Sequence, residues 1–328
     1  MTTTPRPGAV RSSTEQGPER VLVLRALALG DLLAAVPALR AVRRALPEHR
    51  LTLATPGVLE PLAMLTGAVD EVVDVAPLQA LPAAVARPDV AVNLHGRGPQ
   101  STRLLAALSP GRLLAFRHDD VPETADGPEW RPGEHEVARW CRMLSAFGIP
   151  ADPRDLSLPR PDVELCDALR GVTVIHPGAS TAARRWPTDR WALVARAERQ
   201  QGRRVVVTGS PVEAELARAV ADQGGLPQAD VLAGRTDLLT LAALVADAGR
   251  ILCGDTGVAH LASAFGTPSV VLFGPVAPAE WGPPPGPHRA LWKGLTGDGL
   301  ADQVHPGLLA IPVEEVLEAI GTLPTGPS

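Results

Sequence analysis

The segment Leu252–His260 reads LCGDTGVAH, an apolar run that ends in a glycine-containing turn and continues as a helix-like pattern. The first amides of a helix have no intrahelical acceptor, and together with the helix dipole they favour a phosphate or another anion. His260 lies off the apolar stripe of this helix, on the side of Thr256. Asp255, Thr256, Gly257 and His260 are therefore candidate residues of an anion site. The alternative is that Asp255 or Thr256 only caps the helix and that His260 is a surface residue.

A second candidate follows another apolar run, where HPGAS at 176–180 is followed by ARRWP at 183–187. Ser180 supplies a hydroxyl beside a glycine turn. Arg184 and Arg185 supply permanent charges whose fork of N–H donors matches the oxygens of a diphosphate. The pattern predicts a diphosphate-binding loop, and a solvated basic loop over a packed Trp186 is the alternative.

A lone acid, Asp31, follows the first strand-like run in the sequence ALGD. This turn lacks the G-x-G-x-x-G dinucleotide pattern, and the chain has no G-K-[ST] phosphate loop. Asp31 is a candidate general base, although a helix start should lower the pKa of an aspartate. We expect Pro37 inside the same helix, where proline costs about 3 kcal/mol, which favours a functional constraint on this turn. An ordinary carboxylate at the start of a helix is the alternative.

Three further groups are weaker candidates. Glu213 follows the end of a strand, where a carboxylate can accept hydrogen bonds from ribose hydroxyls, or it is an ordinary glutamate of a first helical turn. His95 and Arg97 lie in the glycine-spaced loop NLHGRG and are suited to the acceptor side of a cleft. We interpret a last group as a structural ion-pair cluster: His135, Glu136, Val137 and Arg139.

Strand-like and helix-like segments alternate along the chain, which indicates parallel sheets covered by helices. We expect a flexible tail over residues 1–20, a Rossmann-like domain over 21–150, a Pro-rich linker over 151–161 and a second Rossmann-like domain over 162–328. Ligands of such domains bind at the carboxyl ends of the strands, so the sequence predicts a cleft between the domains. The expected strands are 21–24, 51–54, 71–75, 90–94, 172–176, 204–208, 230–232, 250–253 and 269–273. The expected helices are 31–46, 136–147, 190–200, 212–223, 238–248, 258–265 and 313–320.

Composition excludes several other classes. The net charge of -5, the absence of tyrosine and only 4 phenylalanines argue against a nucleic-acid binder. The 3 cysteines are widely spaced and fit a reducing cytoplasm. No histidine pair has metal-ligand spacing, so we expect no metal and no cofactor. The apolar stretch 21–39 contains Arg25 and Asp31, which excludes a membrane span and leaves at most peripheral membrane contact.

Five motifs in the same order resemble those of glycosyltransferase family 9, the ADP-heptose heptosyltransferases of lipopolysaccharide assembly. The resemblance covers roughly residues 21–320. The motifs are Gly30-Asp31 with Pro37, His176–Ser180, Arg184–Pro187, Gly254–Gly257 with His260, and Phe273–Pro275.

The resemblance implies a GT-B fold, an inverting mechanism without metal, and a nucleotide-sugar donor bound by the C-terminal domain. By resemblance Asp31 is the base, Arg184 contacts the donor phosphates, and Glu213 resembles the ribose-binding glutamate. Asp255, Thr256, Gly257 and His260 correspond to residues beside the diphosphate and the heptose. Family members often carry lysine where this chain has Arg184.

The sequence therefore predicts a cytoplasmic glycosyltransferase that moves a sugar from an ADP-linked donor to a hydroxyl of a glycan, glycolipid or secondary metabolite. In this hypothesis Asp31 removes the acceptor proton, while Arg184, Ser180 and the helix amides after Asp255 hold the leaving diphosphate. Two alternatives remain open. One is a nucleotide-sugar epimerase on the same scaffold, which needs no acceptor. The other is a non-catalytic nucleotide-sugar-binding protein.

Overall fold

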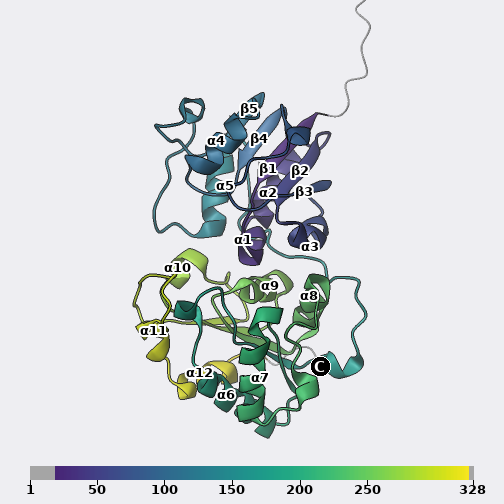
Figure 1. Cartoon of the computed structure of the whole chain (residues 1–328), viewed down its shortest axis with the longest axis vertical. Coiled ribbons are helices and arrows are strands. Elements are labelled where there is room, and N and C mark those ends of the chain that lie inside the picture. The colour runs from purple at the N-terminus through teal and green to yellow at the C-terminus, as the bar shows by residue number, and fades with distance from the viewer. Residues whose placement is uncertain (1–18, 325–328) are drawn as a thin grey trace, which may run out of the picture.

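The computed structural model describes residues 19–324. These residues form two α/β lobes, one from the first part of the chain and one from the second (Figure 1). Each lobe contains a five-stranded sheet whose paired strands are all parallel. The predicted class, two Rossmann-like domains with parallel sheets, is confirmed.

The N-terminal sheet has the strand order β3-β2-β1-β4-β5. Its strands are β1 (Arg20–Leu24), β2 (Arg50–Thr55), β3 (Glu71–Asp74), β4 (Val90–Asn93) and β5 (Arg112–Leu114). The chain proceeds outward from β1 on one side and restarts with β4 on the other. Ligands of open α/β sheets bind at such a switch point, outside the carboxyl ends of the strands. Here β1 leads into the start of α1, which carries Asp31, and β4 leads into the loop that carries His95.

The C-terminal sheet repeats this plan with the strand order β10-β9-β8-β6-β7. Its strands are β6 (Thr173–His176), β7 (Val205–Val207), β8 (Arg250–Gly254), β9 (Ser269–Leu272) and β10 (His288–Leu291). The switch point lies between β6 and β8. The loop after β6 carries Ser180 and Arg184, and the loop after β8 carries Asp255, so these residues start from adjacent strands.

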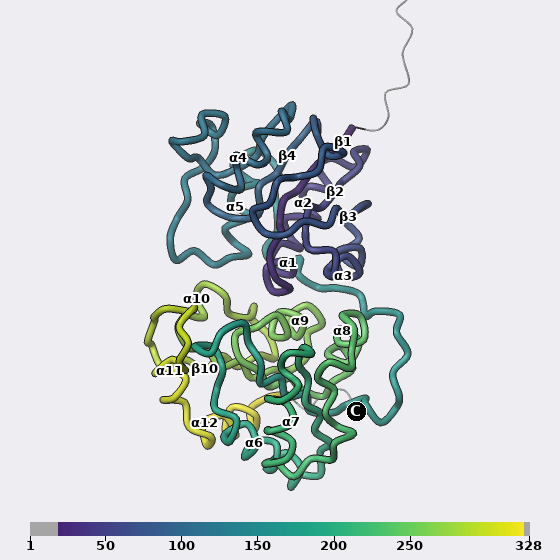
Figure 2. Tube along the Cα trace, viewed as in Figure 1, coloured from purple at the N-terminus to yellow at the C-terminus, as the bar shows by residue number. Residues whose placement is uncertain are grey.

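The helices of the N-terminal lobe are α1 (Leu29–Ala34), α2 (Val36–Ala45), α3 (Glu60–Leu65), α4 (Gln100–Ala106) and α5 (Glu136–Ala146). Those of the C-terminal lobe are α6 (Thr188–Gln200), α7 (Ala214–Gly224), α8 (Leu238–Asp247), α9 (Gly257–Phe265), α10 (Pro278–Trp281), α11 (Pro306–Leu309) and α12 (Val313–Gly321). The segment after α5 passes from one lobe to the other beside α8 (Figure 2). Helices α1 and α9 pack against each other where the lobes meet.

The helix expected over 31–46 is instead two helices, because α1 ends at Ala34 and α2 begins at Val36. Pro37 occupies the first turn of α2, where a backbone N–H needs no intrahelical acceptor. The expected cost of a proline inside a helix is therefore not incurred. The prediction of a distorted helix was wrong, and Pro37 gives no argument for the role of Asp31.

Other boundaries also differ from expectation. The strand expected over 230–232 is wrong: residues 228–230 form a 3-10 turn, and Val231 makes only an isolated bridge to Val207. Edge strands β5 and β10 were missed because they are short and partly exposed. The expected tail lies outside the described residues up to position 18, and Arg20 already belongs to β1. Within residues 19–324, none of the helices combines the length and apolar character that a membrane span requires.

Candidate active site

The two lobes meet where the N-terminal ends of α1 and α9 approach each other (Figure 1). A Cβ atom placed on Gly30 would lie 2.8 Å from Cδ2 of His260. A Cβ atom on Gly257 would lie 2.8 Å from Cγ of Leu29. Such distances are too short for real Cβ contacts, so glycine at both positions permits this close approach. The loops that carry the candidate residues of each lobe thus open into one cleft.

One part of the cleft, which we call the inner pocket, has a volume of about 290 Å³. It brings together most of the predicted site residues, from Asp31 in the first lobe to His260 in the second. Its lining residues are Ala28, Gly30, Asp31, Ser180, Arg184, Asp255, Thr256, Gly257, His260 and Trp281. Trp281 was not predicted, because α10 is a four-residue helix whose docking against α9 no local pattern shows.

A second part, the outer pocket, has a volume of about 560 Å³ and shares five lining residues with the inner pocket. It contains the predicted Glu213. One wall is apolar and consists of Leu238, Leu239 and Leu241 at the start of α8. Val58 and Pro61 of the N-terminal lobe also line it. A pocket with one apolar wall and a few polar groups is typical of a small-molecule site.

Arg184 and Asp255 form an ion pair in the inner pocket, with 2.9 Å between Nη1 and Oδ2. Asp255 is buried, and burial raises the pKa of its carboxyl. The charge of Arg184 opposes this rise, whereas the charge of Asp31 across the cleft adds to it. A Cβ on Gly299 would lie 3.3 Å from Nη2 of Arg184, so glycine at this position leaves room for the guanidinium. Arg184 therefore offers a fixed positive charge to the inner pocket.

Asp31 lines the inner pocket with a side chain that is 23% exposed. Burial raises the pKa of its carboxyl. The positive charge of Arg25 and the N–H of Ala28 oppose the rise, and the negative charge of Glu136 adds to it. The expectation that the helix start lowers this pKa was wrong, because the loss of hydration outweighs the backbone hydrogen bonds. A raised pKa makes Asp31 a stronger base.

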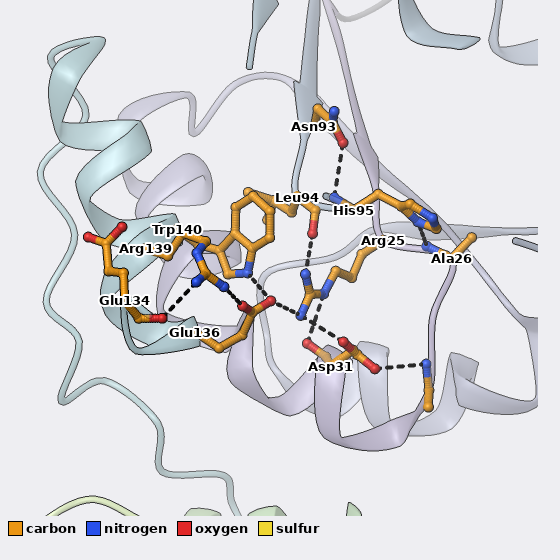
Figure 3. Close-up of polar contacts among 11 residues, drawn as sticks. Arg25, Ala26, Asp31, Asn93, Leu94, His95, Glu134, Glu136, Arg139 and Trp140 are labelled. Atoms are coloured by element: carbon orange, nitrogen blue, oxygen red, sulfur yellow. Dashed lines mark hydrogen bonds and ion pairs between the residues drawn. The ribbon is translucent and has the colours of Figure 1, made fainter. Parts of the chain in front are cut away.

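Behind Asp31 lies a buried polar network from three segments (Figure 3). The guanidinium of Arg25 contacts Asp31, Glu136 and the carbonyl of Leu94. Glu136 in turn accepts from Trp140 and pairs with Arg139. The sequence indicated an ion-pair cluster of His135, Glu136, Val137 and Arg139. The structure confirms the pair of Glu136 with Arg139, whereas Nε2 of His135 bonds the carbonyl of Gly282. The sequence did not indicate that Arg25 completes the cluster. There, an arginine after an apolar strand argued only against a membrane span.

His260 lies at the wall of the inner pocket, as its position off the apolar stripe predicts. Its ring meets Trp281 edge to face, with 5.8 Å between the centroids. Burial lowers the pKa of His260 to about 4, and the nearby His135 and Arg25 contribute to the decrease, whereas Glu136 opposes it. At neutral pH the ring is therefore uncharged, so it is suited to hydrogen bonding rather than to charge neutralisation.

In the outer pocket, Glu213 is held by Ser210, whose backbone N–H and hydroxyl each donate to Oε2 at 2.8 Å. A Cβ on Gly178 would overlap this carboxylate, so the glycine of the HPGAS motif makes room for Glu213. His176 bonds Thr208 through Nδ1 at 3.0 Å, and burial lowers the pKa of its ring. His176 lines the pocket but was not predicted as a site residue.

Three predicted residues lie apart from the cleft. The guanidinium of Arg185 donates twice to the carbonyl of Ala179, at 3.0 and 2.8 Å, and lines neither pocket. The structure thus brings Arg184 into the cleft and leaves Arg185 outside it. His95 accepts from the N–H of Ala26 beside Arg25. Arg97 lines a separate surface pocket of about 210 Å³, together with Arg117, His118, Asp119, Glu129 and Trp130.

Over residues 19–324, no group of three or more His, Cys, Asp or Glu side chains is placed to hold a metal ion. The positive groups at the inner pocket are Arg184 and the N-terminal end of α9.

The family model for glycosyltransferase family 9 (heptosyltransferase) matches residues 128–295. The chain belongs to this family. It is 28% identical to lipopolysaccharide heptosyltransferase 2 of Escherichia coli K12 over 245 residues, which are 72% of this chain and 64% of the relative. The match thus spans slightly less than two thirds of that relative's length. The match to lipooligosaccharide heptosyltransferase 2 of Haemophilus influenzae, also 28% identical, covers 64% of this chain and 60% of the relative.

Among solved structures, the E. coli ADP-heptose lps heptosyltransferase II resembles this chain with a TM-score of 0.72 and 21% identity, over 92% of this chain and 97% of that one. The E. coli heptosyltransferase WaaC with ADP has a TM-score of 0.68 at 18% identity, over 92% and 99%. These likenesses confirm the predicted GT-B fold.

Proposed function

We propose that this member of family 9 is an inverting glycosyltransferase that moves a heptosyl group from an ADP-linked donor to a hydroxyl of a glycan or glycolipid. The observation that carries the proposal is one cleft with a carboxylate from one lobe, Asp31, opposite an arginine from the other, Arg184. A base facing a diphosphate-binding charge is the arrangement that such a transfer needs. Two curated relatives are named heptosyltransferases, which supports heptose as the sugar.

The residues of the two pockets support one orientation for the proposed donor. Its diphosphate would lie in the inner pocket, against Arg184 and the N-terminal end of α9, where backbone N–H groups and the helix dipole favour anions. Its ribose would reach Glu213 in the outer pocket, and its base would lie on the apolar wall of α8. A solved relative is described as holding ADP, which supports adenine as the base.

In the transfer step, the oxygen of the acceptor hydroxyl attacks the anomeric carbon on the face opposite the diphosphate. The bond between that carbon and the diphosphate oxygen breaks, and its electron pair leaves with the diphosphate. Asp31 takes the proton of the hydroxyl, a contribution of roughly 10²–10⁴-fold in rate. Arg184 and the amides of α9 stabilise the charge that develops on the leaving group.

Arg184 can do this without releasing Asp255. A guanidinium has five N–H donors in a planar fork, and the ion pair with Asp255 uses Nη1. The remaining donors can turn to phosphate oxygens. We also propose that the reaction needs no metal, with Arg184 and α9 in the place of a cation.

The test is incubation of the full chain with ADP-heptose, with and without a heptose-accepting lipopolysaccharide core, followed by mass spectrometry. Glycosyl transfer predicts a product one heptose heavier and release of ADP only when the acceptor is present. Conversion of the donor without an acceptor would indicate the epimerase alternative. Donor binding without turnover of any acceptor, unchanged in Asp31→Asn, would indicate a binding protein.

A preceding thermal-shift screen over ADP, UDP, GDP and CDP tests the base. A ligand at 100 times its Kd stabilises by about 2.7 kcal/mol, which is readily seen. We expect the largest shift with ADP, and a larger shift with another nucleoside diphosphate would overturn the choice of adenine.

A further inference from the structure

Arg25 is fully buried, yet its guanidinium reaches a residue of the cleft. Nε donates to the carbonyl oxygen of Asp31 at 3.0 Å, and Nη2 donates to Oδ1 of the same residue at 3.2 Å. Nη1 donates to the carbonyl oxygen of Leu94, at the end of β4. One planar group thus holds both the backbone and the side chain of Asp31 and connects them to the neighbouring strand.

Glu136 at the start of α5 fixes Arg25 in turn. Its Oε1 accepts from Nη2 of Arg25 at 2.9 Å and from Nε1 of Trp140 at 2.8 Å, and its Oε2 pairs with Arg139. The ring of Trp140 also lies under Arg25, with 5.0 Å from Cζ to the ring centroid. A guanidinium held on so many sides cannot change rotamer without breaking several charged hydrogen bonds. The orientation of Asp31 is therefore set from behind (Figure 3).

We propose that Arg25 and Glu136 are positioning residues, which hold the carboxylate of Asp31 at the wall of the inner pocket in the orientation of a general base. This inference rests on the proposed function. Oδ1 of Asp31 is engaged by Arg25, and Oδ2 accepts from the N–H of Ala28 at 3.2 Å. Each carboxylate oxygen has two lone pairs, so one on Oδ2 remains for the proton of an acceptor.

The network also places opposite charges around Asp31. Oδ1 of Asp31 and Oε1 of Glu136 lie 3.2 and 2.9 Å from the same nitrogen of Arg25, so these two oxygens are at most about 6 Å apart. Glu136 therefore favours a protonated Asp31, and Arg25 favours an ionised one. The other ionisable groups around the network are Arg139, which pairs with Glu136, and His95, which accepts from Ala26 beside Arg25. Across the inner pocket lie Arg184, Asp255 and His260.

Variants of the two residues should move the acidic limb of the pH profile of kcat/KM in opposite directions. Glu136→Gln removes a negative charge, so the limb should move to lower pH by about one pH unit. Arg25→Gln removes a positive charge, so the limb should move to higher pH. Arg25→Lys keeps the charge but loses the planar fork, so the limb should stay while kcat falls about tenfold with little change in the KM for the donor.

Glu134→Gln is the matched control. Glu134 lies two residues from Glu136, but its carboxylate pairs with Arg142 at 2.7 Å rather than with Arg25. Its substitution should leave the acidic limb in place. If Arg25→Gln does not fold, Glu136→Gln and this control still decide the question, because glutamine keeps the size of glutamate and its amide oxygen can still accept from Arg25 and Trp140, so that the bond to Arg139 is the one lost.

The result that would overturn the inference is an acidic limb at the same pH in the wild type, Glu136→Gln and Glu134→Gln, while Asp31→Asn is inactive. That outcome would leave Asp31 as the base and make the network purely structural. Transfer at the wild-type rate by Asp31→Asn would instead overturn the proposed function of Asp31, and the positioning role with it.

Discussion

Gly30 and His260 touch across the boundary between the lobes, so closely that a Cβ on Gly30 would lie 2.8 Å from Cδ2 of the imidazole. The imidazole is itself packed against Trp281. The close approach of α1 to α9 therefore depends on the absence of a side chain at position 30. The distance between Asp31 and the C-terminal lobe depends on it as well. This relationship can be tested directly.

We expect Gly30→Ala to slow transfer by roughly 10²-fold, because displacement of a reacting group by about 1 Å is enough for such a loss. The kinetic constants kcat and KM should be measured beside the melting temperature. Gly321→Ala is the control, since outside the adjoining residues and backbone of its own helix no atom lies within 4 Å of a Cβ at that position. Wild-type kinetics in Gly30→Ala would show that the lobes can adjust and that this contact does not set the geometry of the cleft.

Arg184→Ala should weaken donor binding and slow transfer by about ten- to hundredfold. The reason is that a hydrogen bond to a charged group contributes roughly 1.5–3 kcal/mol, which the variant loses. Arg185→Ala is the matched comparison, because this neighbouring guanidinium binds the carbonyl of Ala179 and not the cleft. Steady-state kinetics and calorimetric titration with ADP measure both effects. An equal loss in the two variants would mean that the loop, and not the charge of Arg184, is what the donor needs.

Much of the site could be predicted because its residues follow strand ends, and parallel strands bring their carboxyl ends to one edge. The HPGAS and GDTG motifs were thus found together from local patterns. Pairings between distant segments could not be predicted, since they depend on how elements dock. Glu136 lies 111 residues from Arg25, and Arg184 lies 71 residues from Asp255.

The same limit explains the errors about Asp31. From the sequence, only its place at a helix start was visible, which predicts a lowered pKa. Its burial between two lobes, which raises the pKa, is a property of the assembled fold. Pro37 misled for a related reason, because a break after Ala34 allows α2 to begin with proline in its first turn.

Transfer should be insensitive to chelators. If Arg184 and α9 neutralise the leaving diphosphate, activity should be the same after dialysis against EDTA as before it, and added Mg²⁺ or Fe²⁺ should not raise it. The rate of ADP release is the measurement, with the metal content of the dialysed protein checked by mass spectrometry. Loss of activity on dialysis that Mg²⁺ or Fe²⁺ restores would overturn the proposed metal independence.

Asp31→Asn should separate chemistry from stability. Transfer should fall by roughly 10²–10⁴-fold, while the affinity for ADP should not fall, because the groups proposed to bind the diphosphate belong to the other lobe and the variant removes a negative charge from the inner pocket. An early-melting variant that transfers sugar at the wild-type rate would instead make Asp31 an ordinary helix-start residue.

The stability of the same variant follows from the raised pKa of Asp31. A carboxyl whose pKa is raised by folding binds its proton more tightly in the native state, so it stabilises the fold at low pH and this contribution is lost as pH rises through the native pKa. Asparagine resembles the protonated acid at every pH. At about pH 7.5 the melting temperature of the variant should therefore equal or exceed that of the wild type. Any excess should shrink as the pH is lowered towards about pH 4. Melting curves over that range measure it. A variant that becomes less stable relative to the wild type as the pH rises would show that the fold favours the ionised form of Asp31. This result would contradict the raised pKa and weaken the case for Asp31 as the base.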